Sequence, residues 1–122
     1  MIIDGDPAVR ALAAHHLERE GHRITRVADA MEAVAQFRGG TFDLVLLDME
    51  MPGVGGASFA RMLSDSPRLL GFASPPIVMM TARDEPGLMA DSFDAGAAYF
   101  LKKPFTPREV SDVVRLVLAG TG

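Results

Sequence analysis

Residues 43–56 read DLVLLDMEMPGVGG, an apolar run between two aspartates that is followed by a glycine-rich stretch. A nearly continuous apolar run is typical of a strand that helices cover on both sides, because both of its faces must then be apolar. Residues 76–81, PIVMMT, have the same character. The two runs end in polar residues, Asp48 and Thr81. They predict two central strands of a parallel sheet.

Shorter apolar runs alternate with stretches of helical periodicity along the rest of the chain, which is typical of strand and helix units around a parallel sheet. Further strands are expected at residues 1–3, 23–27 and 98–102, and helices at about 7–21, 29–40, 56–64, 85–95 and 107–119. Gly21 is expected to end the first helix and Asp29 to cap the second. The pattern predicts a doubly wound α/β fold with five strands and five helices, in one domain over residues 1–122.

The overall composition argues against several functions. The net charge is −4 and the twelve basic residues are scattered, so we expect no direct binding of nucleic acid. The chain has no cysteine, which leaves no disulfide or thiolate metal site and fits a cytoplasmic location. No apolar run approaches the roughly 18 residues that cross a bilayer, so we expect no membrane insertion.

Polar residues stand at or just after the ends of four expected strands: Asp4, Asp48, Thr81 and Lys103. Ligands of open parallel sheets bind beyond the carboxyl ends of the strands, so these side chains are expected to meet there. A carboxylate at the end of a buried strand is costly unless it is paired or used. Carboxylates, a hydroxyl and an ammonium in one place indicate phosphoryl chemistry.

In this order, the segments DLVLLDMEMPGVGG, IVMMTA and AGAAYFLKKPF resemble the receiver domain of two-component response regulators. The resemblance covers essentially the whole chain. It implies a flavodoxin-like sheet with strand order 2-1-3-4-5 and a role in signal transduction. The implied partner is a histidine kinase or a phosphotransfer protein. The implied chemistry is limited to self-catalysed phosphoryl transfer and autodephosphorylation, so the chain is not expected to be an enzyme for other substrates.

The same resemblance implies roles for individual residues. Asp48 would be the phosphoacceptor, and Mg²⁺ would be held by Asp4, Asp48 and the backbone carbonyl of Glu50. Lys103 would pair with the oxygens of the phosphoryl group. The hydroxyl of Thr81 would turn inward to donate to that group and would pull its loop along.

The resemblance also implies how a signal leaves the site. Phe100 matches the aromatic switch position, which exchanges between outward and inward rotamers as Thr81 moves. The surface that changes would comprise the helix near 85–95, the strand at 98–102 and the helix near 107–119. A homodimer through this surface is a further possibility. The bond between Lys103 and Pro104 is expected to be cis, in a tight turn that aims the lysine inward.

The first acidic position departs from the family pattern. Receivers usually carry two adjacent acidic residues after the first strand, which correspond here to Asp4 and Gly5. The missing carboxylate should lower the affinity for a hard cation. Asp6 is better explained as a helix cap, with Pro7 at the first helical position. The side chain of Glu50 or water could fill the gap, so a repaired site, a weakened site and a site that no longer accepts phosphate all stay open.

Each assignment has a simpler structural alternative. Thr81 and Phe100 could be ordinary strand and core residues, and Lys102 is expected to be a solvated lysine. Gly5 supports a second function, an atypical receiver that acts as a phosphorylation-independent interaction module. The stretch GVGGAS is a poor match to a dinucleotide-binding loop, which argues against a small nucleotide-binding enzyme. His15 and His16 lack a partner at metal-ligand spacing.

Overall fold

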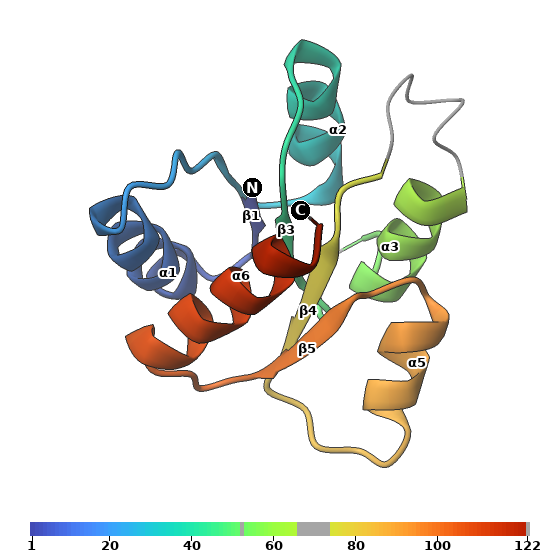
Figure 1. Ribbon diagram of the computed structural model, residues 1–122. Coiled ribbons are helices and arrows are strands. Elements are labelled where there is room, and N and C mark those ends of the chain that lie inside the picture. Colours follow the sequence, from blue (N-terminus) through green and yellow to red (C-terminus); the bar gives the residue numbers. More distant parts are fainter. Residues whose placement is uncertain (52, 66–73, 122) are drawn as a thin grey trace.

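The computed structural model describes residues 1–51, 53–65 and 74–121. Along this part of the chain, strands and helices alternate, as expected (Figure 1). The elements are β1 (Ile2–Ile3), α1 (Pro7–Arg19), β2 (Arg26–Val27), α2 (Ala30–Gly39), β3 (Val45–Asp48), α3 (Gly56–Asp65), β4 (Ile77–Thr81), α5 (Leu88–Asp94), β5 (Tyr99–Lys102) and α6 (Pro107–Thr121).

The five strands form one parallel sheet in the order β2-β1-β3-β4-β5. This order and the flanking helices confirm the predicted doubly wound, flavodoxin-like fold. In the sheet register Asp48 lies opposite Met80, and Thr81 lies opposite Lys102. Because all strands run the same way, their carboxyl ends open at one edge, which is the lower edge in Figure 1.

Alternate residues of the central strands pack into two separate cores, one on each face of the sheet. On one face Val45 and Leu47 join buried side chains of α2 and α3. On the other face Leu46 joins buried side chains of α1 and α6, which lie side by side (Figure 1). The apolar run at residues 44–47 therefore reflects burial on both faces, as predicted.

Both predicted helix caps are present. The carboxylate of Asp6 accepts a hydrogen bond from the backbone N–H of Ala8 at 2.9 Å, and Pro7 is the first residue of α1. The carboxylate of Asp29 accepts from the N–H of Glu32 at 2.9 Å at the start of α2. Each cap satisfies a backbone donor that the first helical turn leaves without an intrahelical partner.

Several boundaries differ from the sequence prediction. The strand expected at 23–27 is reduced to Arg26–Val27. The helix expected at 85–95 begins only at Leu88, after Gly87, whose φ of 89° is left-handed and ends the preceding turn. Pro86 also disfavours a helical conformation at the residue before it. Most of the surface connection expected at 64–76 lies outside the described residues.

Gly56, the first residue of α3, packs against the end of β3. Its N–H donates to the carbonyl of Met49 at 3.1 Å. A Cβ atom on Gly56 would lie 2.3 Å from the backbone oxygen of Asp48 and 2.6 Å from the Cα of Met49. A glycine is required here because two backbone segments meet, so close packing explains this part of GVGGAS without a nucleotide.

Candidate functional site

The carboxyl edge of the sheet brings together the four polar residues that the sequence singled out. Asp48 and Thr81 end β3 and β4, while Asp4 and Lys103 directly follow β1 and β5. The ammonium of Lys103 lies 2.6 Å from Oδ2 of Asp4 and 3.3 Å from Oδ1 of Asp48. One cation therefore bridges the two carboxylates.

The members of this group are almost completely removed from solvent. Asp4 and Thr81 have no exposed surface, and Asp48 is 5% exposed. Burial raises the pKa of Asp4 above its ordinary value, and hydrogen bonds from Lys103 and the N–H of Asp6 only partly offset this. Burial by itself would lower the pKa of Lys103, but its hydrogen bond to Asp4 and the charges of both carboxylates raise it. Lys103 is therefore held in its cationic form.

Backbone donors fix the orientation of both carboxylates. Oδ1 of Asp4 accepts from the N–H of Asp6 at 2.8 Å, and Oδ1 of Asp48 accepts from the N–H of Glu50 at 3.1 Å. The guanidinium of Arg10 donates to the backbone carbonyl of Asp4. The two bonds to the carboxylates come from the loops that follow β1 and β3, so the chain itself aims the two carboxylates at Lys103.

Thr81 is bonded to Glu50 rather than to the aspartates. Its hydroxyl donates to the carboxylate of Glu50, and its Oγ1 accepts from the N–H of Arg83 at 3.0 Å. The guanidinium of Arg83 lies 4.0 Å from the same carboxylate. The side chain of Glu50 therefore does not turn to the gap left by Gly5 in this structure, which was one of the two ways in which that gap was expected to be filled. It is held by Thr81 and Arg83 instead.

The oxygen atoms at this edge match a magnesium site in kind. Asp4, Asp48 and the backbone carbonyl of Glu50 are hard oxygen donors, and Mg²⁺ in proteins is often held by one or two carboxylates with water or phosphate completing its shell. These oxygen donors are few, because Gly5 has no side chain that could add one. Among residues 1–51, 53–65 and 74–121, no three His, Cys, Asp or Glu side chains gather at metal-binding distance.

Lys102 has partners that the sequence analysis did not foresee. Its ammonium donates to the backbone carbonyls of Ala82 at 3.0 Å and Arg83 at 2.5 Å, and it lies 3.3 Å from the carboxylate of Asp84. The side chain is 43% exposed, as expected for a solvated lysine, but it also has these backbone and ion-pair partners. The contacts join positions almost twenty residues apart, and no local pattern signals them.

The two other predicted positions lie beside this edge. Phe100 is partly buried and packs against the core on the α2 and α3 face of the sheet. The peptide bond between Lys103 and Pro104 is cis.

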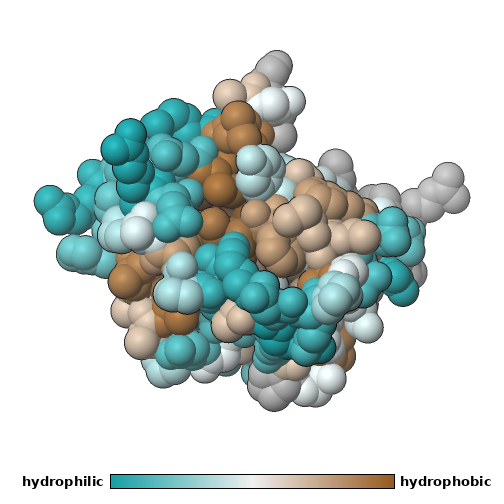
Figure 2. All heavy atoms as spheres, turned by 90° about the horizontal axis from the view of Figure 1, so that it is seen from below, coloured by the Kyte–Doolittle hydropathy of each residue, from teal (hydrophilic) through white to brown (hydrophobic). Residues whose placement is uncertain are grey.

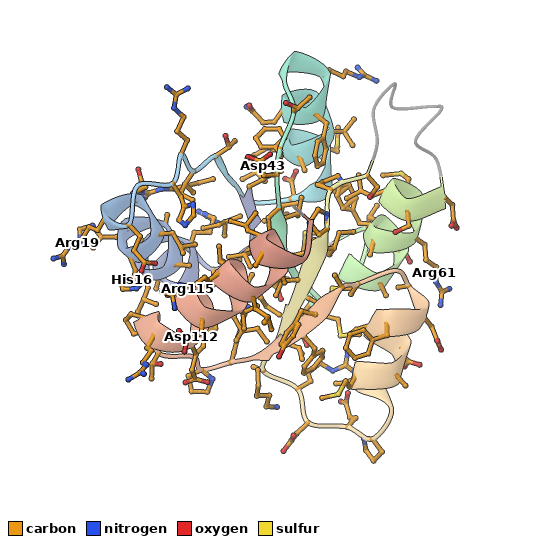
Figure 3. All side chains as sticks on the ribbon, viewed as in Figure 1. His16, Arg19, Asp43, Arg61, Asp112 and Arg115 are labelled. Carbon is orange, nitrogen blue, oxygen red and sulfur yellow. The ribbon has the colours of Figure 1, made fainter. Side chains whose placement is uncertain are left out.

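A separate polar cluster lies between α1 and α6, away from the four strand-end residues. His16, Asp112 and Arg115 lie near one another there (Figure 3) and line one pocket. The hydroxyl of Ser111 donates to the carboxylate of Glu20 at 2.7 Å, and the imidazole of His16 lies 3.7 Å from that carboxylate. His16 thus lies beside a carboxylate, but no metal-binding group forms around it within the described part of the chain.

Residues 1–115 match the family of the response regulator receiver domain. The chain therefore belongs to this family of two-component signal-transduction domains. None of the helices that the structure describes is long and apolar enough to cross a membrane.

Relatives with known names agree with this assignment. The transcriptional regulatory protein ResD of Bacillus subtilis is 33% identical over 118 residues, which are 97% of this chain and 47% of ResD. Protein PetR of Rhodobacter capsulatus is 36% identical over 110 residues, which are 90% of this chain and 44% of PetR. The chain thus spans about half the length of these relatives.

Solved structures show the same fold. The chemotaxis protein CheY4 of Vibrio cholerae has a TM-score of 0.84 and 27% identity, covering 95% of this chain and 94% of CheY4. The receiver domain of NtrX from Brucella abortus has a TM-score of 0.85 and 25% identity, covering 97% of this chain and 96% of that domain.

Proposed function

We propose that this receiver domain accepts a phosphoryl group on Asp48 from a cytoplasmic histidine kinase or phosphotransfer protein. The observation that carries the proposal is the position of Lys103, whose ammonium bridges Asp48 and Asp4. An anionic carboxylate can approach an anionic phosphoryl group only where positive charge offsets the repulsion. Lys103 supplies that charge.

In the transfer, an oxygen of Asp48 forms a bond to phosphorus while the bond from phosphorus to the donor's nitrogen or oxygen breaks. The leaving group departs with the bonding electrons and takes a proton from solvent. Lys103 holds its charge against the phosphoryl oxygens throughout. A magnesium ion held by Asp4, Asp48 and the carbonyl of Glu50 would add positive charge against the same oxygens.

Thr81 and Phe100 would carry the signal. The hydroxyl of Thr81, which donates to Glu50 in this structure, would turn to the phosphoryl group on Asp48. Phe100 would then occupy the space that Thr81 vacates and change the surface of α5, β5 and α6. Phe100 is only partly buried, which leaves it room to change rotamer.

Intact-mass spectrometry after incubation with acetyl phosphate, with and without Mg²⁺, tests this function. We expect one phosphate adduct in the parent protein and none in Asp48→Asn. Asp48→Asn keeps the size of the side chain but loses the nucleophilic carboxylate. Gly5→Asp restores the second acidic position, and we expect it to lower the Mg²⁺ concentration needed for half-maximal labelling about tenfold, because it adds one anionic ligand.

The same experiment separates the alternative function, a receiver that acts as an interaction module without phosphorylation. Gly5 favours this alternative, as does the engagement of both Asp4 oxygens by Lys103 and Asp6. An adduct in Gly5→Asp but none in the parent would support the interaction module and contradict phosphorylation of Asp48 in this chain.

A homodimer is the proposed outcome of switching. Viewed from below, the molecule shows both hydrophobic and hydrophilic patches (Figure 2). The large apolar side chains exposed on α5, β5 and α6 are Met89, Phe93, Tyr99 and Leu116. Burying them against a second copy would be favourable by roughly 25 cal/mol per Å² of apolar surface.

Light scattering checks this dimer. We expect the molar mass of the parent to rise toward that of a dimer when the protein is phosphorylated. We expect Phe93→Glu to stay monomeric, because it would place a charge in the apolar interface. A matched change outside this surface, Met31→Glu on exposed α2, should dimerise like the parent. If Phe93→Glu and Met31→Glu reach the same molar mass after phosphorylation, the dimer does not form through α5, β5 and α6.

A further inference from the structure

The loop between β4 and α5 is held from two sides. On one side, Glu50 binds the hydroxyl of Thr81 and faces Arg83. On the other side, Lys102 donates to the carbonyls of Ala82 and Arg83. Lys102 is the last residue of β5 and lies opposite Thr81 in the sheet register, so its contacts reach the backbone that directly follows Thr81.

We propose that Lys102 is a positioning residue that holds this loop, and Thr81 with it, in the unphosphorylated arrangement. The inference rests on the proposed function, in which Thr81 turns from Glu50 toward Asp48. Within the described residues, the contacts of Lys102 are to Ala82, Arg83 and Asp84 and not to Asp48, so it acts through the backbone after Thr81.

Thr81 cannot turn toward Asp48 without moving the backbone that follows it. The hydroxyl of Thr81 can reach a group on Asp48 only if the backbone at residues 82–84 follows, because the N–H of Arg83 is bonded to the same oxygen. Lys102 is the last residue of a sheet strand. Its ammonium donates hydrogen bonds to two backbone carbonyls and forms an ion pair with Asp84. Moving the loop therefore requires these contacts to break or to form again elsewhere.

Solvent limits how strongly the contacts of Lys102 hold the loop after β4. The side chain of Lys102 is 43% exposed and that of Asp84 is 97% exposed, so their ion pair is largely screened. The two hydrogen bonds to carbonyls involve a charged donor and are the stronger part. A rise of about threefold to tenfold in the population of the released loop is expected when they are lost.

The test compares Lys102→Gln with Lys102→Arg, which keeps the charge and the donors, and with Arg61→Gln, which removes an exposed cation from α3 (Figure 3). Amide hydrogen exchange at residues 82–84 is measured by NMR in the unphosphorylated proteins. The rate of adduct formation from acetyl phosphate is measured at high ionic strength, which screens the loss of one charge.

We expect Lys102→Gln to raise both the exchange at residues 82–84 and the rate of adduct formation by about threefold to tenfold. Lys102→Arg and Arg61→Gln should match the parent. Exchange and labelling rates in Lys102→Gln that equal those of Arg61→Gln would overturn the inference. Faster exchange in Lys102→Gln with an unchanged labelling rate would also overturn the inference about Lys102. If the parent is labelled in that case, the proposed function still stands. If no protein forms an adduct, the proposed function fails, and the role of Lys102 in phosphorylation fails with it.

Discussion

Lys103→Met is expected to lower the free energy of unfolding by about 3 kcal/mol at neutral pH, because it leaves two buried carboxylates without their shared cation. The side chain of Lys103 is only 13% exposed, and Asp4 has no exposed surface. Methionine fills a similar volume, so the loss comes from charge rather than from a cavity. Urea unfolding in a buffer with a chelator, which keeps metal ions from replacing the lysine, measures the difference.

The stabilisation of the folded state by Lys103 is expected to decrease at high pH. The pKa of Lys103 is raised in the folded protein, so the folded state holds its proton more tightly than the unfolded chain does. The stabilisation is fully present below the ordinary pKa of 10.5 and is lost as the pH rises through the folded value. The difference between parent and Lys103→Met should therefore be constant near neutral pH and shrink in strongly alkaline buffer.

Lys102→Met is the matched control for this prediction, because it removes the neighbouring lysine from an exposed position. It should cost less than about 1.5 kcal/mol, because its ion pair is screened and only its two hydrogen bonds to carbonyls contribute more. Equal stabilities for the two methionine variants at neutral pH would contradict the view that Lys103 compensates a buried charge pair.

Gly56→Ala is expected to lower the free energy of unfolding by about 3 kcal/mol through overpacking. The new Cβ would lie 2.3 Å from the backbone oxygen of Asp48 and 2.6 Å from the Cα of Met49. Both are backbone atoms, so a side-chain rotation cannot relieve the clash, and the start of α3 or the end of β3 must shift. A shift of β3 would move Asp48, which ends this strand, and labelling by acetyl phosphate should then slow as well.

Gly55→Ala provides the control at the preceding position. A Cβ on Gly55 would meet nothing within 4 Å, so this variant should unfold within about 0.5 kcal/mol of the parent. Urea unfolding of both variants checks the pair. A Gly56→Ala protein as stable as Gly55→Ala would mean that α3 can move away from β3 at little cost.

The sequence was sufficient for the fold class and for placing Asp4, Asp48, Thr81 and Lys103 at one edge of the sheet. The apolar run before Asp48 predicts a strand buried on both faces, and helical periodicity around it predicts the covering helices. Asp6 was correctly interpreted as a helix cap, because a short polar side chain before a proline matches the local chemistry of a helix start. These features depend on near neighbours or on strand ends, which a sequence displays directly.

The contacts around Thr81 could not be predicted in this way. Glu50 and Lys102 each contact residues at the end of β4 or in the loop after it, so their partners depend on how that loop lies. Both side chains are long and flexible, and their partners include backbone carbonyls that every residue carries. The roles of Asp48, Thr81 and Phe100 in phosphorylation and switching stay predictions until labelling is measured.

The bond between Lys103 and Asp4 joins residues that are 99 positions apart. Contacts of such high sequence separation form late, since much of the chain must be ordered before its ends can meet. During synthesis, β1 and β3 leave the ribosome long before β5 does. Asp48 therefore lacks its cationic partner, Lys103, until nearly the whole domain has been synthesised. A nascent or truncated chain that ends before β5 has both carboxylates but not the complete site.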